Sequence, residues 1–186
     1  GLSTVMGAAY AGAAKIIVCD PLQSRREAAW ALMCSSGEPH HKSLACSSGE
    51  PHHKLLASAD PAKIREMTEG RGADYVFECV GTPALQELAF ECARPGGTIV
   101  FSGLSPVGSA TNIPGSRLVR EEKTVMGSYY GTSDPARDFP KYAKLYDCPR
   151  SSASHPKAVF EDDVPEGNWE LVVFFVRTGG DYIEPF

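Results

Sequence analysis

The first twenty residues constrain the fold of this chain more than any other stretch. Small residues run from Gly1 to Ala14, which suits a helix packed closely against a sheet, and a β-branched apolar run follows from Lys15 to Cys19. The change of pattern predicts a helix that leads into a buried strand. A strand that is apolar on both faces is typical of a parallel sheet covered by helices on both sides.

Asp20 follows this predicted strand directly, nineteen residues after Gly1. In a dinucleotide-binding unit, a carboxylate at this place accepts a hydrogen bond from the ribose hydroxyls of the adenosine half. Gly1 then corresponds to the third glycine of G-x-G-x-x-G, and the first two glycines and the strand before them have no counterpart in the sequence. The alternative interpretation is a helix and a strand of any parallel α/β protein.

Composition excludes several classes of function. The chain has 186 residues, of which 42% are hydrophobic and 22% charged, as expected for one globular domain. A net charge of -5 with scattered lysines and arginines argues against a nucleic-acid surface. No apolar run reaches the roughly 20 residues of a membrane span, and no secretory signal is visible. The six cysteines include no C-x-x-C pair, which favours buried thiols in a reducing cytoplasm.

A nine-residue segment occurs twice, as Cys34–Lys42 and as Cys46–Lys54. One hypothesis treats its cysteines and histidines as zinc or copper ligands. The other treats the repeat as a duplication that lengthened a surface loop, which costs little because closure entropy grows slowly with loop length. The candidate ligands are Cys34, His40, His41, Cys46, His52 and His53.

Helices and strands are expected to alternate through the rest of the chain as far as Tyr146. The βαβ order implies parallel neighbours joined by right-handed connections. The expected elements are a helix capped by Ser24 and running to Met33, a helix from Ala62 to Thr68 capped by Asp60, a strand from Asp74 to Val80, a helix from Ala84 to Ala93 stopped by residues 94–97, a strand from Thr98 to Ser102, a short edge strand from Ser109 to Pro114, a helical segment from Leu118 to Glu122, a strand from Thr124 to Gly131, a helix punctuated by Asp134, Asp138 and Pro140 that runs to Tyr146, and an apolar core segment from Leu171 to Val176.

Five of these segments, in this order, resemble the coenzyme-binding domain of zinc-containing medium-chain alcohol dehydrogenases. The segments are Gly1-Leu2 at the start of a helix, Ile16–Asp20, Gly70–Gly81, Arg94–Gly103 and Lys123–Gly131. The branch that the chain resembles most includes the thiol-dependent formaldehyde dehydrogenases. The resemblance implies an α/β fold, a Rossmann-like doubly wound parallel sheet, that lacks the first strand and the first two fingerprint glycines. It divides the chain into a partial NAD(P)-binding domain, residues 1–146 with the duplicated loop 34–54, and a divergent segment, residues 147–186.

The resemblance also implies where NAD would bind, in the crevice at the carboxyl ends of the strands. Gly1 and Leu2 would lie by the pyrophosphate, and Asp20 and Arg25 by the adenosine ribose. The residues expected along the cofactor are Cys79, Val80 and Gly81, and those expected on its nicotinamide side are Ser102, Gly103, Leu104, Ser128, Tyr129 and Tyr130.

The family's zinc ligands and proton-relay groups precede the glycine motif, so this sequence is expected to contain no catalytic and no metal-binding residue. The implied function is the coenzyme-binding part of an NAD-dependent, zinc-containing alcohol dehydrogenase. The full-length parent would act on a small alcohol or aldehyde, and the fragment would not be catalytic by itself. The alternatives are a non-catalytic nucleotide-binding or oligomerisation module and a Cys/His metal-binding α/β protein.

The missing first strand would be central in the sheet, between Lys15–Cys19 and Asp74–Val80. Its absence would leave a slot roughly 10 Å wide with two unpaired edges. We expect one of three outcomes: the flanking strands close up, another segment such as Leu171–Val176 fills the slot, or the chain does not fold well alone.

Two further expectations concern partners. Asp20 would accept from the 2′-hydroxyl of NAD and repel the 2′-phosphate of NADP, although Arg25 and Arg26 could offset that repulsion. NAD is therefore the expected cofactor. Thr111–Ile113 resembles the edge strand through which the family pairs its coenzyme domains, so a homodimer is expected.

Overall fold

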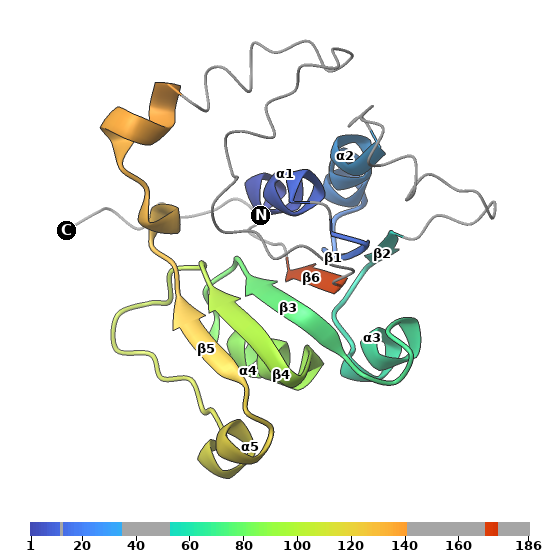
Figure 1. Ribbon diagram of the computed structural model, residues 1–186, viewed down its shortest axis with the longest axis vertical. Helices are drawn as coiled ribbons and strands as arrows, with labels where there is room; N and C mark the ends of the chain where they lie inside the picture. Colours follow the sequence, from blue (N-terminus) through green and yellow to red (C-terminus); the bar gives the residue numbers. More distant parts are fainter. Residues whose placement is uncertain (12, 35–52, 141–169, 175–186) are drawn as a thin grey trace.

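The computed structural model describes residues 1–11, 13–34, 53–140 and 170–174, and these form one six-stranded sheet with helices on both faces (Figure 1). The strand order is β2-β1-β6-β3-β4-β5, and every neighbouring pair is parallel. The predicted doubly wound α/β fold is therefore confirmed. The elements are α1 (Leu2–Tyr10), β1 (Lys15–Cys19), α2 (Gln23–Cys34), β2 (Lys54–Leu56), α3 (Pro61–Met67), β3 (Ala73–Glu78), α4 (Pro83–Cys92), β4 (Ala93–Phe101), α5 (Gly115–Arg120), β5 (Thr124–Gly127), the 3-10 turn η1 (Tyr130–Thr132), a helix over 135–140 and β6 (Glu170–Phe174).

Strand β6 lies in the middle of the sheet, although it comes last in the described chain (Figure 1). It pairs in parallel with five residues of β1 and four residues of β3, so that Val172 lies between Ile17 and Val76. Of the three expected outcomes for the missing strand, the second is found. The apolar segment near the C-terminus fills the slot, with strand geometry over Glu170–Phe174.

Each face of the sheet has its own apolar core, because successive side chains along a strand point to opposite faces. The small residues of α1 let this helix approach the sheet closely, as its sequence predicts. The core beside α1 and α2 contains Val5, Ala8, Ala13, Ile16, Val18 and Ala29, and the core beside α3 and α4 contains Ile17, Cys19, Ile64, Ala73, Val76, Ala89, Phe90, Cys92, Ala93 and Ile99.

Helix α2 begins at Gln23, so the prediction that Ser24 caps it is wrong. The turn after β1 starts the helix instead. The Asp20 Oδ1 atom accepts the N–H of Leu22 at 2.8 Å, and the Leu22 carbonyl accepts the N–H of Arg26 at 3.2 Å. Asp20 therefore stabilises the turn before α2 and also lies directly after the carboxyl end of β1.

Helix α3 confirms its predicted cap, because the Asp60 side chain accepts the N–H of Ala62 at 2.9 Å. Strand β4 begins earlier than predicted, at Ala93. Residues 94–97, expected as a stop, lie inside the strand as an irregularity in its pairing with β3. Strand β5 ends at Gly127 rather than at Gly131, because the chain turns into η1.

The predicted edge strand from Ser109 to Pro114 is not formed. Its polar groups bind side chains of α4 instead of a strand edge: Thr111 Oγ1 contacts Gln86 Oε1, and the N–H of Asn112 donates to Glu87 Oε1 at 2.9 Å. In the described part of the chain, β5 is the strand at this edge of the sheet.

The predicted helix around Asp134 and Asp138 is described over 135–140. Its continuation to Tyr146 lies outside the described residues. Of the helices in the described part, none is long and apolar enough to cross a membrane.

Candidate functional site

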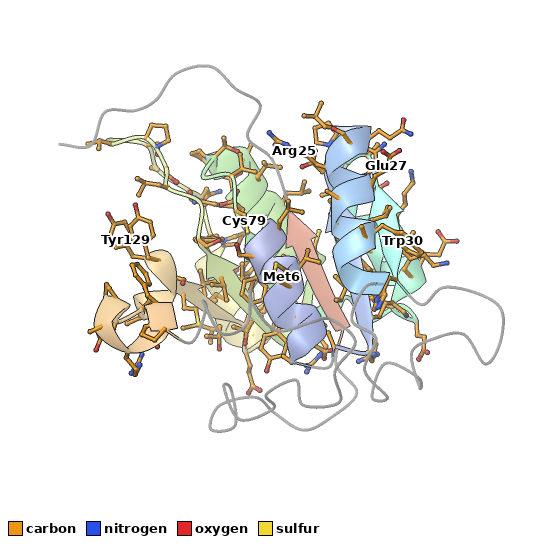
Figure 2. All side chains as sticks on the ribbon, turned by 90° about the horizontal axis from the view of Figure 1, so that it is seen from above. Met6, Arg25, Glu27, Trp30, Cys79 and Tyr129 are labelled. Carbon is orange, nitrogen blue, oxygen red and sulfur yellow. The ribbon has the colours of Figure 1, made fainter. Side chains whose placement is uncertain are left out.

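The predicted site residues come together at one edge of the sheet. Because the strands are parallel, the residues that follow β1, β3, β4 and β5 all meet at the carboxyl edge. The first turn of α1 lies at the same edge: Thr4 Oγ1 is 3.7 Å from Cys79 Sγ, and Figure 2 shows Cys79 beside α1. Gly1 and Leu2 are exposed at the start of this helix.

Asp20 presents a buried acceptor atom without a hydrogen-bond donor. Its side chain is fully buried, and Oδ2 has no hydrogen-bond partner. The Arg25 Nη1 atom is 3.9 Å from Oδ2, an ion-pair distance that is too long for a hydrogen bond. A buried oxygen left unpaired costs about 1–3 kcal/mol, so such atoms are uncommon. Oδ2 therefore fits a donor from outside the chain, such as a sugar hydroxyl.

The two arginines at the start of α2 differ in their surroundings. Arg26 Nη1 donates to the main-chain oxygen of Asp20 at 2.5 Å. The carboxyl end of β1 therefore holds Arg26 in place. The side chain of Arg25 is about one third exposed and lies beside the Asp20 carboxylate.

The loops after β3 and β4 touch through their backbones. Gly81 has a φ of +88°, and a Cβ atom placed on it would lie 2.2 Å from the Leu104 carbonyl oxygen. A Cβ atom on Gly103 would lie 2.1 Å from the Gly81 nitrogen. Only glycine has the conformational freedom and the missing side chain that this crossing requires. The two loops are therefore packed directly against each other at the carboxyl edge.

Glu78, the last residue of β3, holds both loops. Its side chain is fully buried, and Oε1 accepts the N–H of Val80 at 2.7 Å and of Gly81 at 2.8 Å. Its main-chain oxygen accepts the N–H of Ser102 at 2.8 Å and of Gly103 at 2.9 Å. Burial raises the pKa of the Glu78 carboxyl above its ordinary value of 4.5, and the two N–H donors partly oppose that rise.

Glu78 is not among the site residues that the sequence pattern predicts. The available signal was a carboxylate that follows the apolar residues Val76 and Phe77 and stands three residues before a glycine. A charged residue in such a strand is rarely buried without a specific partner.

Cys79 lies on the sheet face covered by α1, where its sulfur is 3.2 Å from Ser102 Oγ. The other two described cysteines, Cys19 and Cys92, are fully buried and free. Burial raises the pKa of the Cys19 thiol to about 12 and raises that of Cys92 further. Both thiols are therefore protonated and packed in the core.

The residues after β5 are open to solvent. The Ser128 N–H donates to the Phe101 carbonyl at 2.9 Å, which attaches this segment to β4. Tyr129 and Tyr130 are 70% and 80% exposed, and their rings meet edge to face with centroids 4.5 Å apart. The structure thus places Asp20 and the two glycine loops at the same carboxyl edge of the sheet, where the tyrosines and Leu104 are exposed.

Of the six candidate metal ligands, His53 is the one whose side chain the structure describes. Among the described residues, no group of three His, Cys, Asp or Glu residues could hold a metal ion. His53 is 8% exposed, and its Nδ1 atom accepts the N–H of Ile16 at 3.1 Å, which is a structural contact with β1. The other candidate ligands have side chains outside the described part: Cys34, His40, His41, Cys46 and His52.

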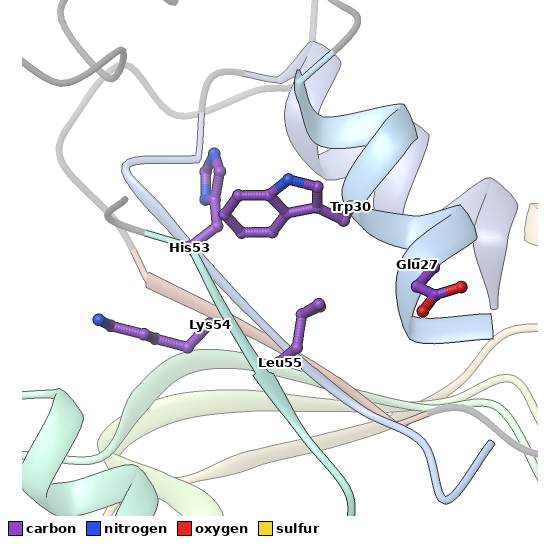
Figure 3. A pocket seen from close by; sticks show the side chains of 5 residues that line it. All are labelled: Glu27, Trp30, His53, Lys54 and Leu55. Atoms are coloured by element: carbon purple, nitrogen blue, oxygen red, sulfur yellow. The ribbon is translucent and has the colours of Figure 1, made fainter. Parts of the chain in front are cut away.

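A pocket of about 440 Å³ lies away from the carboxyl edge, at the amino end of β2 (Figure 3). It is open to solvent and is lined by Glu27, Trp30, His53, Lys54 and Leu55. Its lining residues lie on α2, on β2 and directly before β2, and β2 is the edge strand on the side of the sheet opposite β4 and β5.

Comparison with protein families matches residues 1–147 to the family described as zinc-binding dehydrogenase. The NDMA-dependent alcohol dehydrogenase of Amycolatopsis methanolica is 34% identical over 151 residues, which are 78% of this chain and 36% of that protein. Alcohol dehydrogenase 1 of Zea mays is 32% identical over 150 residues, which are 78% of this chain and 35% of that protein. The chain thus spans about a third of the length of these relatives.

Solved structures show the same fold. Benzyl alcohol dehydrogenase from Acinetobacter calcoaceticus superposes with a TM-score of 0.63 at 24% identity, over 78% of this chain and 36% of that chain. A zinc-binding domain protein of the alcohol dehydrogenase type from Burkholderia ambifaria gives a TM-score of 0.62 at 26% identity, over 78% and 35% of the two chains.

Proposed function

Because the chain belongs to the zinc-binding dehydrogenase family, we propose that it is the coenzyme-binding part of an NAD-dependent alcohol dehydrogenase. The observation that carries the proposal is the buried Oδ2 atom of Asp20 at the carboxyl edge of the sheet, which has no hydrogen-bond partner. NAD would supply the hydride acceptor of the reaction. The chain's own contribution is to bind and orient this cofactor.

The proposed binding residues follow the edge of the sheet. Asp20 and Arg25 would meet the adenosine ribose, with Gly1 and Leu2 toward the pyrophosphate. At Gly81 and Gly103 the two loops cross in direct backbone contact, so no side chain separates one loop from the other. The further residues proposed for the cofactor are Cys79, Val80, Ser102, Leu104, Ser128, Tyr129 and Tyr130.

We assign cofactor binding alone to this chain, and alcohol oxidation to a longer protein of the length of its relatives. Zinc would polarise the alcohol oxygen in that protein. Within the family we propose the branch of the thiol-dependent formaldehyde dehydrogenases, on the five sequence segments that resemble it. A protein containing this chain should then oxidise formaldehyde only when a thiol is added.

Two further proposals concern the location of the protein in the cell and its oligomeric state. A cytoplasmic location is supported by the buried, free thiols of Cys19 and Cys92. A homodimer would pair Thr111–Ile113 of two copies, which requires this segment to take strand geometry and release its contacts with α4. Sedimentation of the chain at micromolar concentration tests the dimer, and a strictly monomeric mass would exclude it.

The cofactor assignment is tested by titrating the chain with NADH and NADPH and following nicotinamide fluorescence. We expect NADH to bind more tightly, because Asp20 would face the 2′-phosphate of NADPH at a cost on the order of 1 kcal/mol or more. Asp20→Ser should narrow or reverse the preference, since a serine hydroxyl still accepts from Leu22 but carries no charge. The control is Asp60→Ser, the same change at an aspartate that caps α3. Equal affinity of the unmutated chain for the two cofactors would refute the assignment.

A further inference from the structure

We propose that Glu78 is a positioning residue of the nucleotide site, which fixes the loops after β3 and β4 in the shape that receives the cofactor. The proposal rests on the proposed cofactor binding for its affinity test. It does not rest on that function for its test by hydrogen exchange.

Glu78 makes contacts to both loops with two different groups. Its carboxylate oxygen Oε1 accepts the amides of Val80 and Gly81, and its carbonyl accepts the amides of Ser102 and Gly103. The hydroxyl of Ser102 donates to the same carbonyl at 3.0 Å. The carbonyl contacts are available to any residue at this position, whereas the two contacts of Oε1 need an acceptor side chain.

The side-chain contacts decide the conformation of the first loop. Gly81 has a positive φ, which an unrestrained chain adopts as one of several alternatives. Hydrogen bonds from two successive amides to one carboxylate oxygen stabilise the conformation with the positive φ over its alternatives. Because Gly81 lies against Gly103, a shift of the first loop must also displace the second.

A second buried polar group extends the arrangement along the loop after β4. Gln86 of α4 is 5% exposed, and its Nε2 atom donates to Ser105 Oγ at 2.8 Å. The loop is therefore fixed at Ser102 and Gly103 by Glu78 and at Ser105 by Gln86. Of the residues proposed for the nicotinamide side, Leu104 lies between these two attachments.

Burying Glu78 costs stability, because its Oε2 atom has no hydrogen-bond partner and its pKa is raised by desolvation. An apolar residue at this buried position would stabilise the folded chain more than a carboxylate does, if the residue had no role outside β3. We therefore attribute the carboxylate at this position to the amides of Val80 and Gly81, from which it accepts hydrogen bonds.

Thr68 provides a matched control at the other end of β3. It is also fully buried, and its Oγ1 atom accepts the N–H of Gly72 at 2.9 Å. Thr68→Val removes a buried acceptor from a glycine amide, as Glu78→Leu does, but far from the carboxyl edge. Glu78→Gln keeps an acceptor oxygen at nearly the same place.

The first experiment measures amide hydrogen exchange of the full chain without cofactor. The amides of Val80 and Gly81 should be as protected as those inside β3, and Glu78→Leu should expose them while Thr68→Val does not. If Glu78→Leu does not fold, the exchange rates of the unmutated chain and of Glu78→Gln still test the proposal, because both proteins should protect the amides of Val80 and Gly81. Exchange of the two amides at the rate of free loops in the unmutated chain would overturn the proposal.

The second experiment measures NADH affinity of the same variants. Glu78→Leu should weaken binding about tenfold, and Glu78→Gln and Thr68→Val should change it by less than about threefold. Equal weakening by Glu78→Leu and Thr68→Val would show a loss of stability only and would overturn the positioning role. If the unmutated chain binds no NADH, the proposed function fails, and the exchange experiment still tests Glu78.

Discussion

Strand β6 offers a stringent test of how this chain folds. A variant that ends at residue 169 lacks β6, which pairs with five residues of β1 and four of β3. With roughly one backbone hydrogen bond per pair and a net gain of about 1 kcal/mol each, the loss is about 9 kcal/mol. The net stability of a whole domain is about 5–15 kcal/mol. We therefore expect the shortened chain to show no cooperative unfolding transition.

Urea unfolding followed by circular dichroism measures this loss. The control is a chain that ends at Phe174 and keeps β6, and it should unfold cooperatively. A peptide covering residues 168–176 should restore a transition to the shortened chain, since it supplies the missing strand. A cooperative transition of the chain ending at 169, with nearly the midpoint of the control, would refute the central role of β6.

Three further outcomes are expected. Deleting residues 34–45 removes one copy of the duplicated segment. The NADH affinity should stay unchanged and the Tm should change by less than about 4 °C, because the other copy still leads into β2. A larger fall in Tm would contradict this expectation. Gly103→Ala should lower the free energy of unfolding in urea by about 1–3 kcal/mol, because its Cβ would lie 2.1 Å from a backbone nitrogen; an unchanged midpoint would argue against the crossing. Ion pairs with Arg117 and Lys123 lower the pKa of Glu121 from 4.5 to about 2, so its contribution to stability should be present above pH 4.5 and disappear as the pH falls through about 2. The Tm difference between the unmutated chain and Glu121→Gln should shrink over that range, and a constant difference would count against these pairs.

The parts of the fold that the sequence predicted depend on neighbouring residues. Helix α3 was predicted because Asp60 and Pro61 are a local start signal, and the capping bond is present. The order β3-α4-β4 followed from two apolar runs with a helix between them. Asp20 was located at the carboxyl edge because its place after an apolar strand fixes it there.

The parts that the sequence did not predict depend on contacts between distant residues. The residues of β6 are apolar without a clear period, so their place in the slot was expected only as one of three outcomes, and the open edges of β1 and β3 select it. Thr111 and Asn112 were expected in a strand, but side chains of α4 compete for their polar groups. The role of Glu78 depends on two loop conformations that no local pattern specifies.

The contact between His53 and β1 has a consequence for how this chain can change over generations. The two copies of the duplicated segment extend over residues 34–45 and 46–57 and differ only at Ser43 and Leu55. Each copy therefore carries its own pair of histidines, and the pair of the second copy stands directly before β2. Whole copies can be gained or lost by unequal recombination, and the last copy still presents the same histidine to Ile16. Lineages that carry this segment should therefore vary its length in steps of twelve residues while the sheet stays the same.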